Sequence, residues 1–309
     1  MKKIITILFL TISVFGYSQH LEWIPFNWIG DSVGNKYFDK LAMTIPVTID
    51  DLPHKFNMQL DLGAGTTNFY GNKIKPYLEK YPSLKAKIDP TIRNPFGDKY
   101  YDMFTNIDLH LGDVTFDNIH VLHYDKYGSE IPEDSIYTET EKQIGTIAPD
   151  LFRNKILIID YKQQRLAVTE TLPVEYSDAA FVKYETKHVR IKIPLNINGK
   201  EELLMFDTGS SIFQLTTTKE NALKIGSPEI VETLTVNSWG DKITFYGLKT
   251  VVPIYFGTKE LKNSIVYYDD KGSFDDFYET ENMWGLTGNA YFFDNIVIIN
   301  YKELLFGVK

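Results

Sequence analysis

Two aspartates stand at the ends of apolar, strand-like segments, and each is followed by a glycine turn. Asp61 lies in residues 58–65, MQLDLGAG, and Asp207 lies in residues 204–211, LMFDTGSS. Glycine accepts positive φ, so each aspartate is expected on a tight loop. Two carboxyl groups about 3 Å apart cannot both ionise cheaply, so they share a proton and supply a base and an acid together. If the fold brings the pair together, it can activate water for hydrolysis.

The composition excludes several other chemistries. The chain has no Cys, which removes thiol catalysis, Cys-ligated zinc, iron–sulfur clusters and disulfides. The histidines include no helical i, i+4 pair around a Glu, so we expect no metal and no cofactor. Residues 30–32, GDS, are similar to the nucleophile turn of a family of secreted esterases. No histidine follows His188 to serve as the base, so a serine hydrolase is not favoured.

The segments that must position the two aspartates recur in the chain. Residues 45–49, IPVTI, correspond to residues 193–197, IPLNI. Residues 145–168 align without gaps to residues 285–308. Several matches in the same order indicate an internal repeat rather than chance similarity.

Short alternating strands separated by Gly, Asn and Asp turns predict an all-β chain. We expect two homologous β-barrel lobes, residues 19–175 and residues 176–309, related by a pseudo-twofold axis with a cleft between them. Equivalent residues near such an axis face each other. Asp61 and Asp207 are therefore expected to form a carboxylate pair.

Residues 207–210, DTGS, resemble the signature of the pepsin-like aspartic proteases, to which the retropepsins are related. In that two-lobed family each lobe supplies one Asp-Thr-Gly and a later apolar-apolar-Gly segment, for which QIG at 143–145 and MWG at 283–285 are the counterparts. The resemblance implies a secreted aspartic endopeptidase that hydrolyses polypeptides without a cofactor. It also implies catalytic and loop-supporting roles for Asp61, Asp207, Gly63, Thr208, Gly209 and Ser210.

Three positions depart from the family pattern. Leu62 replaces the threonine whose hydroxyl, in the family, bonds across to the other lobe, and Ala64 stands where many members carry a hydroxyl. The expected flap over the cleft, about residues 94–105, offers Phe96 before the turn at Gly97 rather than an obvious tyrosine. The alternative function is therefore a catalytically weak or inactive pepsin-fold module that binds peptides or acts like an inhibitor.

The same departures lead to an expectation about the shared proton. Ser210 could donate a hydrogen bond to Asp207, whereas Ala64 offers none to Asp61. Asp61 is thus predicted to be the more readily protonated member. Phe213, Phe96 and Trp239 are the aromatic residues expected nearest the cleft.

Two acidic segments, residues 125–141 and residues 269–281, precede the apolar-Gly segments. Neither has the spacing of a calcium loop, so both are expected to be solvated loops. In the alternative that stays open, these loops line the cleft and favour basic peptides.

The N-terminus predicts export. Lys2 and Lys3 precede a short apolar run, residues 4–15, and a cut near Ser18 would remove residues 1–18 as a signal peptide. No other long apolar run occurs, so no membrane span is expected. A net charge of −9 without a basic tail argues against nucleic acid as a partner. We expect a monomer in the periplasm or outside the cell.

Overall fold

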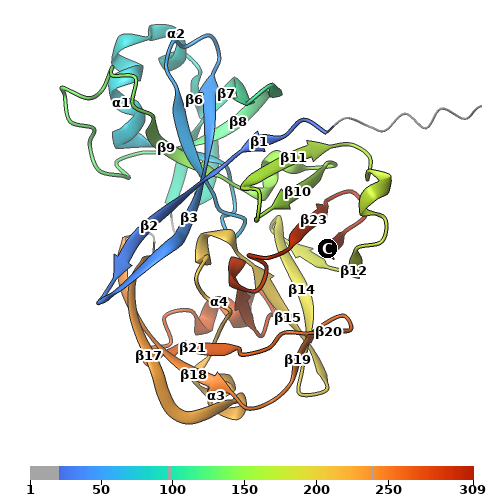
Figure 1. Cartoon of the computed structure of the whole chain (residues 1–309). Coiled ribbons are helices and arrows are strands. Elements are labelled where there is room, and N and C mark those ends of the chain that lie inside the picture. Colours follow the sequence, from blue (N-terminus) through green and yellow to red (C-terminus); the bar gives the residue numbers. More distant parts are fainter. Residues whose placement is uncertain (1–20, 97–98, 239) are drawn as a thin grey trace, which may run out of the picture.

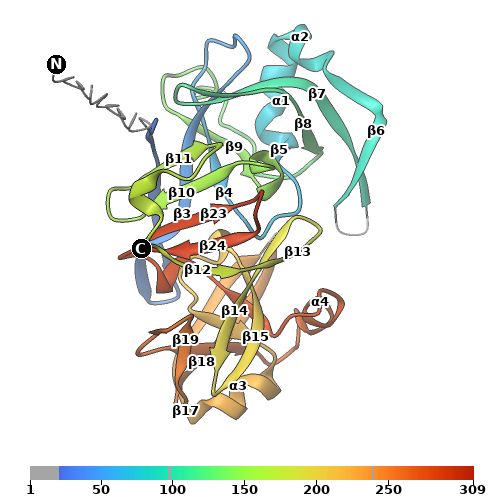
Figure 2. The same ribbon diagram turned by 90° about the vertical axis from the view of Figure 1, so that its right-hand side faces the viewer.

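The computed structural model describes residues 21–96, 99–238 and 240–309. The signal peptide predicted for residues 1–18 lies outside these ranges. The described chain is mostly β, arranged in three sheets with a few short helices, which confirms the all-β class. Figures 1 and 2 show residues from the first half of the chain above, residues from the second half below, and one sheet with strands from both.

The N-terminal half, residues 21–175, contains an eight-stranded sheet. Its strand β4 alternates buried Phe56, Met58 and Leu60 with half-buried Asn57 and Gln59, because side chains two apart share one face of a strand. In spatial order the strands are β2 (Asn27–Val33), β3 (Lys36–Ile49), β4 (Phe56–Leu60), β9 (Lys142–Ile147), β5 (Asn68–Tyr70), β8 (Val114–Tyr124), β7 (Lys99–Leu111) and β6 (Ile88–Phe96).

The C-terminal half, residues 176–309, contains a ten-stranded sheet with the same strand order over seven strands: β6-β7-β8-β5-β9-β4-β3 corresponds to β17-β18-β21-β16-β22-β15-β14. The pairings agree too, since β4 runs parallel to β9 and β15 runs parallel to β22. The strands are β13 (Glu185–Lys187), β14 (Arg190–Ile197), β15 (Lys200–Phe206), β16 (Leu215–Thr217), β17 (Gly226–Ser238), β18 (Asp241–Thr250), β19 (Ile254–Phe256), β20 (Lys259–Glu260), β21 (Ile265–Asp269) and β22 (Gly285–Thr287).

A six-stranded sheet joins the halves. Its two central strands, β10 and β23, pair antiparallel with Ile158 opposite Ile298, which are equivalent residues of the sequence repeat. All five residues of β10 are buried, because this sheet is covered on both faces. In spatial order its strands are β1 (Ile24–Pro25), β11 (Arg165–Thr169), β10 (Ile156–Asp160), β23 (Ile296–Asn300), β24 (Leu305–Val308) and β12 (Ala180–Lys183).

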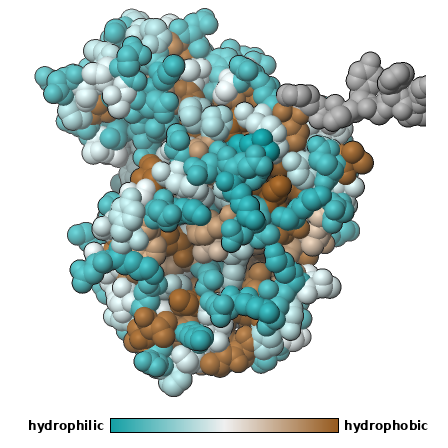
Figure 3. Space-filling model, viewed as in Figure 1, coloured by the Kyte–Doolittle hydropathy of each residue, from teal (hydrophilic) through white to brown (hydrophobic). Residues whose placement is uncertain are grey.

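The helices are short and pack against the two larger sheets, α1 against β5 and β9, and α3 against β16, β17, β18 and β21. On α1, Ile74, Tyr77 and Leu78 are buried along one face. One apolar cluster runs through both halves and the sheet that joins them. On the face shown in Figure 3, hydrophobic areas are small and separated by hydrophilic ones. The helices are α1 (Gly71–Lys80), α2 (Pro82–Lys85), α3 (Lys219–Ile225) and α4 (Asp275–Thr280).

Candidate active site

The two aspartates follow equivalent strands and are anchored in the same way. Asp61 comes directly after β4, and its N–H donates to the carbonyl of Ile147 on β9 at 2.9 Å. Asp207 comes directly after β15, and its N–H donates to the carbonyl of Thr287 on β22, also at 2.9 Å. Each aspartate is therefore pinned to the neighbouring parallel strand at the start of its loop.

The loops bring the two carboxyl groups together. A Cβ built on Gly63 would lie 2.4 Å from Cγ of Asp207, and one built on Gly209 would lie 2.7 Å from Cγ of Asp61. Each glycine thus lies against the carboxyl group of the opposite half, where any side chain would collide with it. The approach of the two loops is nearly symmetric, and both aspartates line one cleft.

Backbone N–H groups hold each carboxylate. Asp61 Oδ1 accepts from Gly63 N and Ala64 N at 3.0 Å each. Asp207 Oδ1 accepts from Gly209 N at 2.8 Å. The expected donation from the Ser210 hydroxyl to Asp207 is not among the hydrogen bonds of the described residues; the backbone of Ser210 contributes instead. Ser210 itself lines the cleft.

Burial raises the pKa of both carboxyl groups. The pKa of Asp61 lies well above its ordinary range, because the group is desolvated and faces the charge of Asp207. Burial also raises the pKa of Asp207, but hydrogen bonds from the Asp61 carboxyl and from backbone N–H groups work against this rise. Both shifts favour a pair of carboxyl groups that shares one proton, and the pKa of Asp61 is the one raised by the charge of its partner.

The Thr208 hydroxyl forms two hydrogen bonds between the two loops. Thr208 Oγ1 accepts from Leu62 N at 2.9 Å and donates to the carbonyl of Leu60 at 2.8 Å. Leu62 is completely buried in the main apolar cluster and offers no hydroxyl in return. Asn289 braces the Thr208 loop from behind, because its Nδ2 donates to the Thr208 carbonyl at 3.1 Å. The link between the loops is thus one-sided.

The cleft around the pair has a volume of about 720 Å³, which is within the range of ligand sites. Three hairpins contribute to its walls: β2 with β3, β6 with β7, and β17 with β18 (Figure 1). Large apolar and aromatic side chains provide much of the remaining lining: Tyr70, Tyr127, Met205, Ile212, Phe213, Phe245, Phe274, Phe277 and Leu286.

The segment expected as a flap is a hairpin beside the active-site loop. Strands β6 and β7 pair up to Phe96 and Lys99, Pro95 lines the cleft, and Asn94 Nδ2 donates to Thr66 Oγ1 at 3.0 Å. Gly97, the Phe96 side chain and Trp239 lie outside the described parts. Of the expected cleft aromatics, Phe213 lines the cleft.

The two acidic segments contribute aromatic rings to the cleft rather than acids: Tyr127 from the first, and Phe274 and Phe277 from the second. Sequence reasoning missed these rings, and it also missed Arg190 and the β2–β3 hairpin as cleft-lining features. No motif in the sequence marks Arg190, which begins the β14–β15 hairpin that leads to Asp207. The β2–β3 hairpin contains Gly30-Asp31-Ser32, considered for a serine hydrolase; these residues lie within β2 rather than in a turn, and the Asp31 carboxylate accepts from Ser32 N at 2.7 Å.

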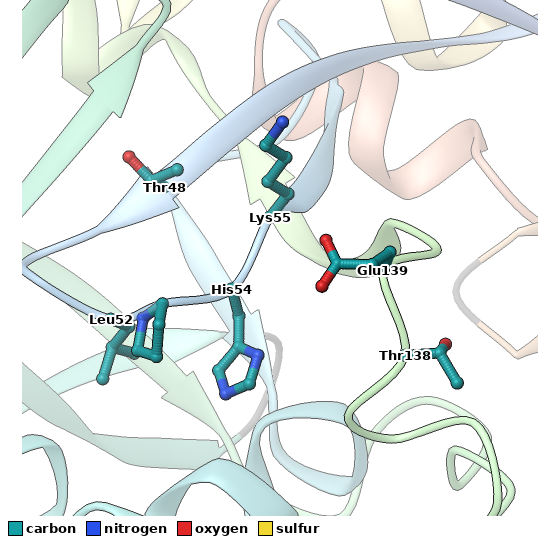
Figure 4. A pocket seen from close by; sticks show the side chains of 7 residues that line it. Thr48, Leu52, His54, Lys55, Thr138 and Glu139 are labelled. Atoms are coloured by element: carbon teal, nitrogen blue, oxygen red, sulfur yellow. The ribbon is translucent and has the colours of Figure 1, made fainter.

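A second, smaller cavity of about 240 Å³ lies beside His54 in the N-terminal half. His54 Nε2 is 2.6 Å from the Tyr81 hydroxyl, and the rings of Tyr77 and Tyr137 pack against the imidazole. In Figure 4 the side chains of His54 and Lys55 extend in opposite directions, so they do not converge on a common point. His54 is therefore committed to the aromatic cluster, and this cavity lacks a constellation for catalysis.

Within residues 21–96, 99–238 and 240–309, no group of three or more His, Asp or Glu side chains is placed to hold a metal ion. In the same ranges, no helix combines the length and the apolar character that crossing a membrane requires. Searches against protein-family models and against curated proteins found no match to the chain.

Proposed function

We propose that the chain is an aspartic endopeptidase of pepsin-like fold, in which Asp61 and Asp207 activate water. The observation that carries the proposal is the placing of two carboxyl groups, on equivalent loops of two similar sheets, at one cleft. Their raised pKa values support it, because a pair that keeps one proton offers an acid and a base at the same pH. Both groups are needed for this chemistry.

The proposed architecture is two lobes, residues 19–175 and residues 176–309, related by a pseudo-twofold axis. The shared strand order of the two larger sheets supports it, as does the Ile158–Ile298 pair at the centre of the joining sheet. An axis through that pair would relate β10 to β23 and the Asp61 loop to the Asp207 loop. We further propose that residues 1–18 direct export and that the chain acts as a monomer.

In the proposed mechanism, the Asp207 carboxylate takes a proton from a water molecule held between the two carboxyl groups. The water oxygen attacks the scissile carbonyl carbon, while the Asp61 carboxyl donates its proton to the carbonyl oxygen. The tetrahedral intermediate then collapses and the C–N bond breaks. The proton that Asp207 took passes to the leaving amine, and Asp61 recovers its proton from the intermediate.

The cleft suits a polypeptide. Its volume accommodates several residues, and its aromatic and aliphatic lining can bury apolar side chains on both sides of the scissile bond. The hairpin β6–β7 and the hairpin β17–β18 lie on different sheets and can contact an extended peptide from two sides. Unpaired strand edges would add backbone hydrogen bonds to such a peptide.

One observation favours the second candidate, a peptide-binding module without turnover. Leu62 has no hydroxyl to form a second bond of the kind that Thr208 forms between the loops, so this link is one-sided. A looser pair would still line a peptide-binding cleft. It would, however, lose the fixed geometry that catalysis requires.

The test is digestion of a mixed denatured-protein substrate by the purified chain between about pH 3 and pH 7. We expect cleavage that pepstatin inhibits and that Asp207→Asn lowers by about 10²–10⁴-fold, the range contributed by general acid–base groups. Asp113→Asn is the matched control, since it removes an exposed carboxylate from the turn between β7 and β8. Absence of cleavage by a folded chain at every pH would reject the protease and favour the binding module.

A further inference from the structure

Arg190 is the basic residue of the cleft. In the described parts of the chain, the charged side chains that line it are Asp31, Asp61, Asp207 and Arg190. Arg190 begins β14 in the C-terminal half, yet its guanidinium reaches the loop that carries Asp61. Its Nε lies 3.4 Å from the carbonyl oxygen of Gly63, two residues after the aspartate. A positive group is thus placed beside the proposed site of hydrolysis.

The guanidinium is fixed in place from one side. Its Nη1 donates to Glu281 Oε1 at 3.0 Å, and its Cζ lies 5.1 Å from the centre of the Phe277 ring. The Glu281 side chain is only 4% exposed and the Arg190 side chain 22% exposed. A guanidinium held in this way loses little further conformational entropy when it binds a ligand.

The remaining nitrogen of the guanidinium, Nη2, is available for a ligand. Among the described residues, Arg190 Nη2 has no hydrogen-bond acceptor. Nη2 faces Gly65. A Cβ built on Gly65 would lie 3.8 Å from Nη2, which is an ordinary contact distance, and no other atom would be closer to it. Because Gly65 has no side chain, the space in front of Nη2 belongs to the cleft.

The charge of Arg190 is only partly neutralised. Lys192, the next inward-facing residue of β14, is also buried, and its Nζ donates to the backbone carbonyl of Glu281 at 2.8 Å. The Glu281 carboxylate thus pairs with Arg190 and is approached to 3.1 Å by His188 Nδ1, whereas Lys192 contacts the backbone of the same residue. Of this cluster, Arg190 lines the cleft, where the other charged side chains of the described residues are acidic.

We propose that Arg190 is a specificity-determining residue that binds a carboxylate group of the substrate through Nη2. This inference rests on the proposed function, and it names the substrate class: peptides that carry a carboxylate near the scissile bond. That carboxylate comes either from a Glu or Asp side chain or from the C-terminus of a short peptide. Charge-assisted hydrogen bonds from a guanidinium to a carboxylate are among the strongest in proteins.

The experiment compares peptides with Glu or Gln at each of the four positions on either side of a bond that the chain cleaves. A second set ends at each of these positions in a free carboxylate or in an amide, which distinguishes the two sources. Each kcat/KM is measured at about pH 6, where Glu is ionised. Binding of the same peptides to Asp207→Asn, followed by fluorescence anisotropy, provides a readout that does not need turnover.

Three variants test the residue itself. Arg190→Gln removes the charge, but it leaves Glu281 buried without its partner and can disturb the fold. Gly65→Asp keeps Arg190 and places a carboxylate within reach of Nη2. This carboxylate belongs to the protein itself and competes with the substrate carboxylate for Nη2. Gly65→Asn, its neutral counterpart of the same size, controls for the added bulk.

In the native chain we expect a Glu-over-Gln preference of about tenfold at one position, which corresponds to about 1.4 kcal/mol. Gly65→Asp should abolish the preference and Gly65→Asn should keep it. Efficient cleavage with equal rates for Glu and Gln everywhere, and for acid and amide ends, would overturn the inference and leave the protease intact. If nothing is cleaved, the proposed function fails and the anisotropy measurements test the inference separately. Tighter binding of the carboxylate peptides than of their neutral counterparts, lost in Gly65→Asp, supports the inference. Equal binding of the two kinds of peptide overturns it.

Discussion

Replacement of Thr208 by valine should weaken both the fold and the proposed activity, because one hydroxyl provides the link between the active-site loops. Valine matches the shape of threonine but has no hydroxyl. The variant leaves the N–H of Leu62 without its partner and removes one donor from the carbonyl of Leu60. Thr208 is completely buried, so water cannot replace the lost bonds. A buried group left unpaired costs about 1–3 kcal/mol, so we expect a loss of about 2–4 kcal/mol.

The loss is measured as the change in the free energy of unfolding in urea at constant m value. With an unfolding entropy of about 2.1 cal/mol/K per residue, it corresponds to a drop in Tm of roughly 3–7 °C. Thr208→Ser is the matched control, since it keeps the hydroxyl and removes only a methyl group. We expect Thr208→Val to lower kcat by about tenfold or more even where the variant is fully folded, because misplaced reacting groups lose rate steeply.

A destabilisation of Thr208→Val below about 0.5 kcal/mol, the size of an ordinary surface substitution, would refute this reasoning. So would equal losses in Thr208→Val and Thr208→Ser, since the methyl group and not the hydroxyl would then be responsible. In either case the loops would be held by the strand anchors and by Asn289 alone.

Two further predictions concern the aspartates and their glycines. Folding raises the pKa of Asp61, so the folded state binds the Asp61 proton more tightly than the unfolded state does. The resulting contribution to the free energy of unfolding is fully present below the pKa of the unfolded state. It is lost as the pH rises through the pKa of the folded state. Asp61→Asn, which cannot ionise, should therefore gain in Tm relative to the native chain as the pH rises above the ordinary pKa of an aspartate, about 4; a constant difference in thermal melts would contradict the shift. Gly63→Ala places a Cβ 2.4 Å from the Asp207 carboxyl carbon and should reduce both stability and activity, whereas Gly65→Ala meets its nearest atom only at 3.8 Å. Similar losses for the two alanine variants in urea unfolding and peptide cleavage would show that the close approach is not decisive.

The sequence was sufficient to predict the class of fold and to select the candidate pair of aspartates. Alternating strands and turn residues are local signals, and they predicted an all-β chain. Asp61 and Asp207 could be chosen because each follows a strand of the same repeat, and equivalent positions in a repeat fold alike. The structure places both at one cleft, as expected.

The residues that shape the cleft could not be found in this way. Arg190 reaches Gly63 from a strand of the other half, and that contact depends on how the halves pack rather than on any local pattern. Tyr127 and Phe277 belong to segments whose composition suggested solvated acidic loops, but their rings turn into the cleft. The expected role of the Ser210 hydroxyl failed for a related reason: backbone N–H groups already satisfy the Asp207 carboxylate.

The one-sided link through Thr208 is compatible with a well-positioned pair because the loops do not depend on it alone. Each aspartate is tied by its own N–H to a neighbouring strand at 2.9 Å, and the six-stranded sheet joins the halves behind the loops. Leu62 then contributes apolar packing, because its side chain is completely buried in the main apolar cluster. A buried leucine contributes about as much as a neutral hydrogen bond or more. At Leu62 the loop is therefore stabilised by apolar packing rather than by a second hydrogen bond. On this reasoning the cleft can keep the geometry that hydrolysis requires, with Arg190 providing a further contact between the halves.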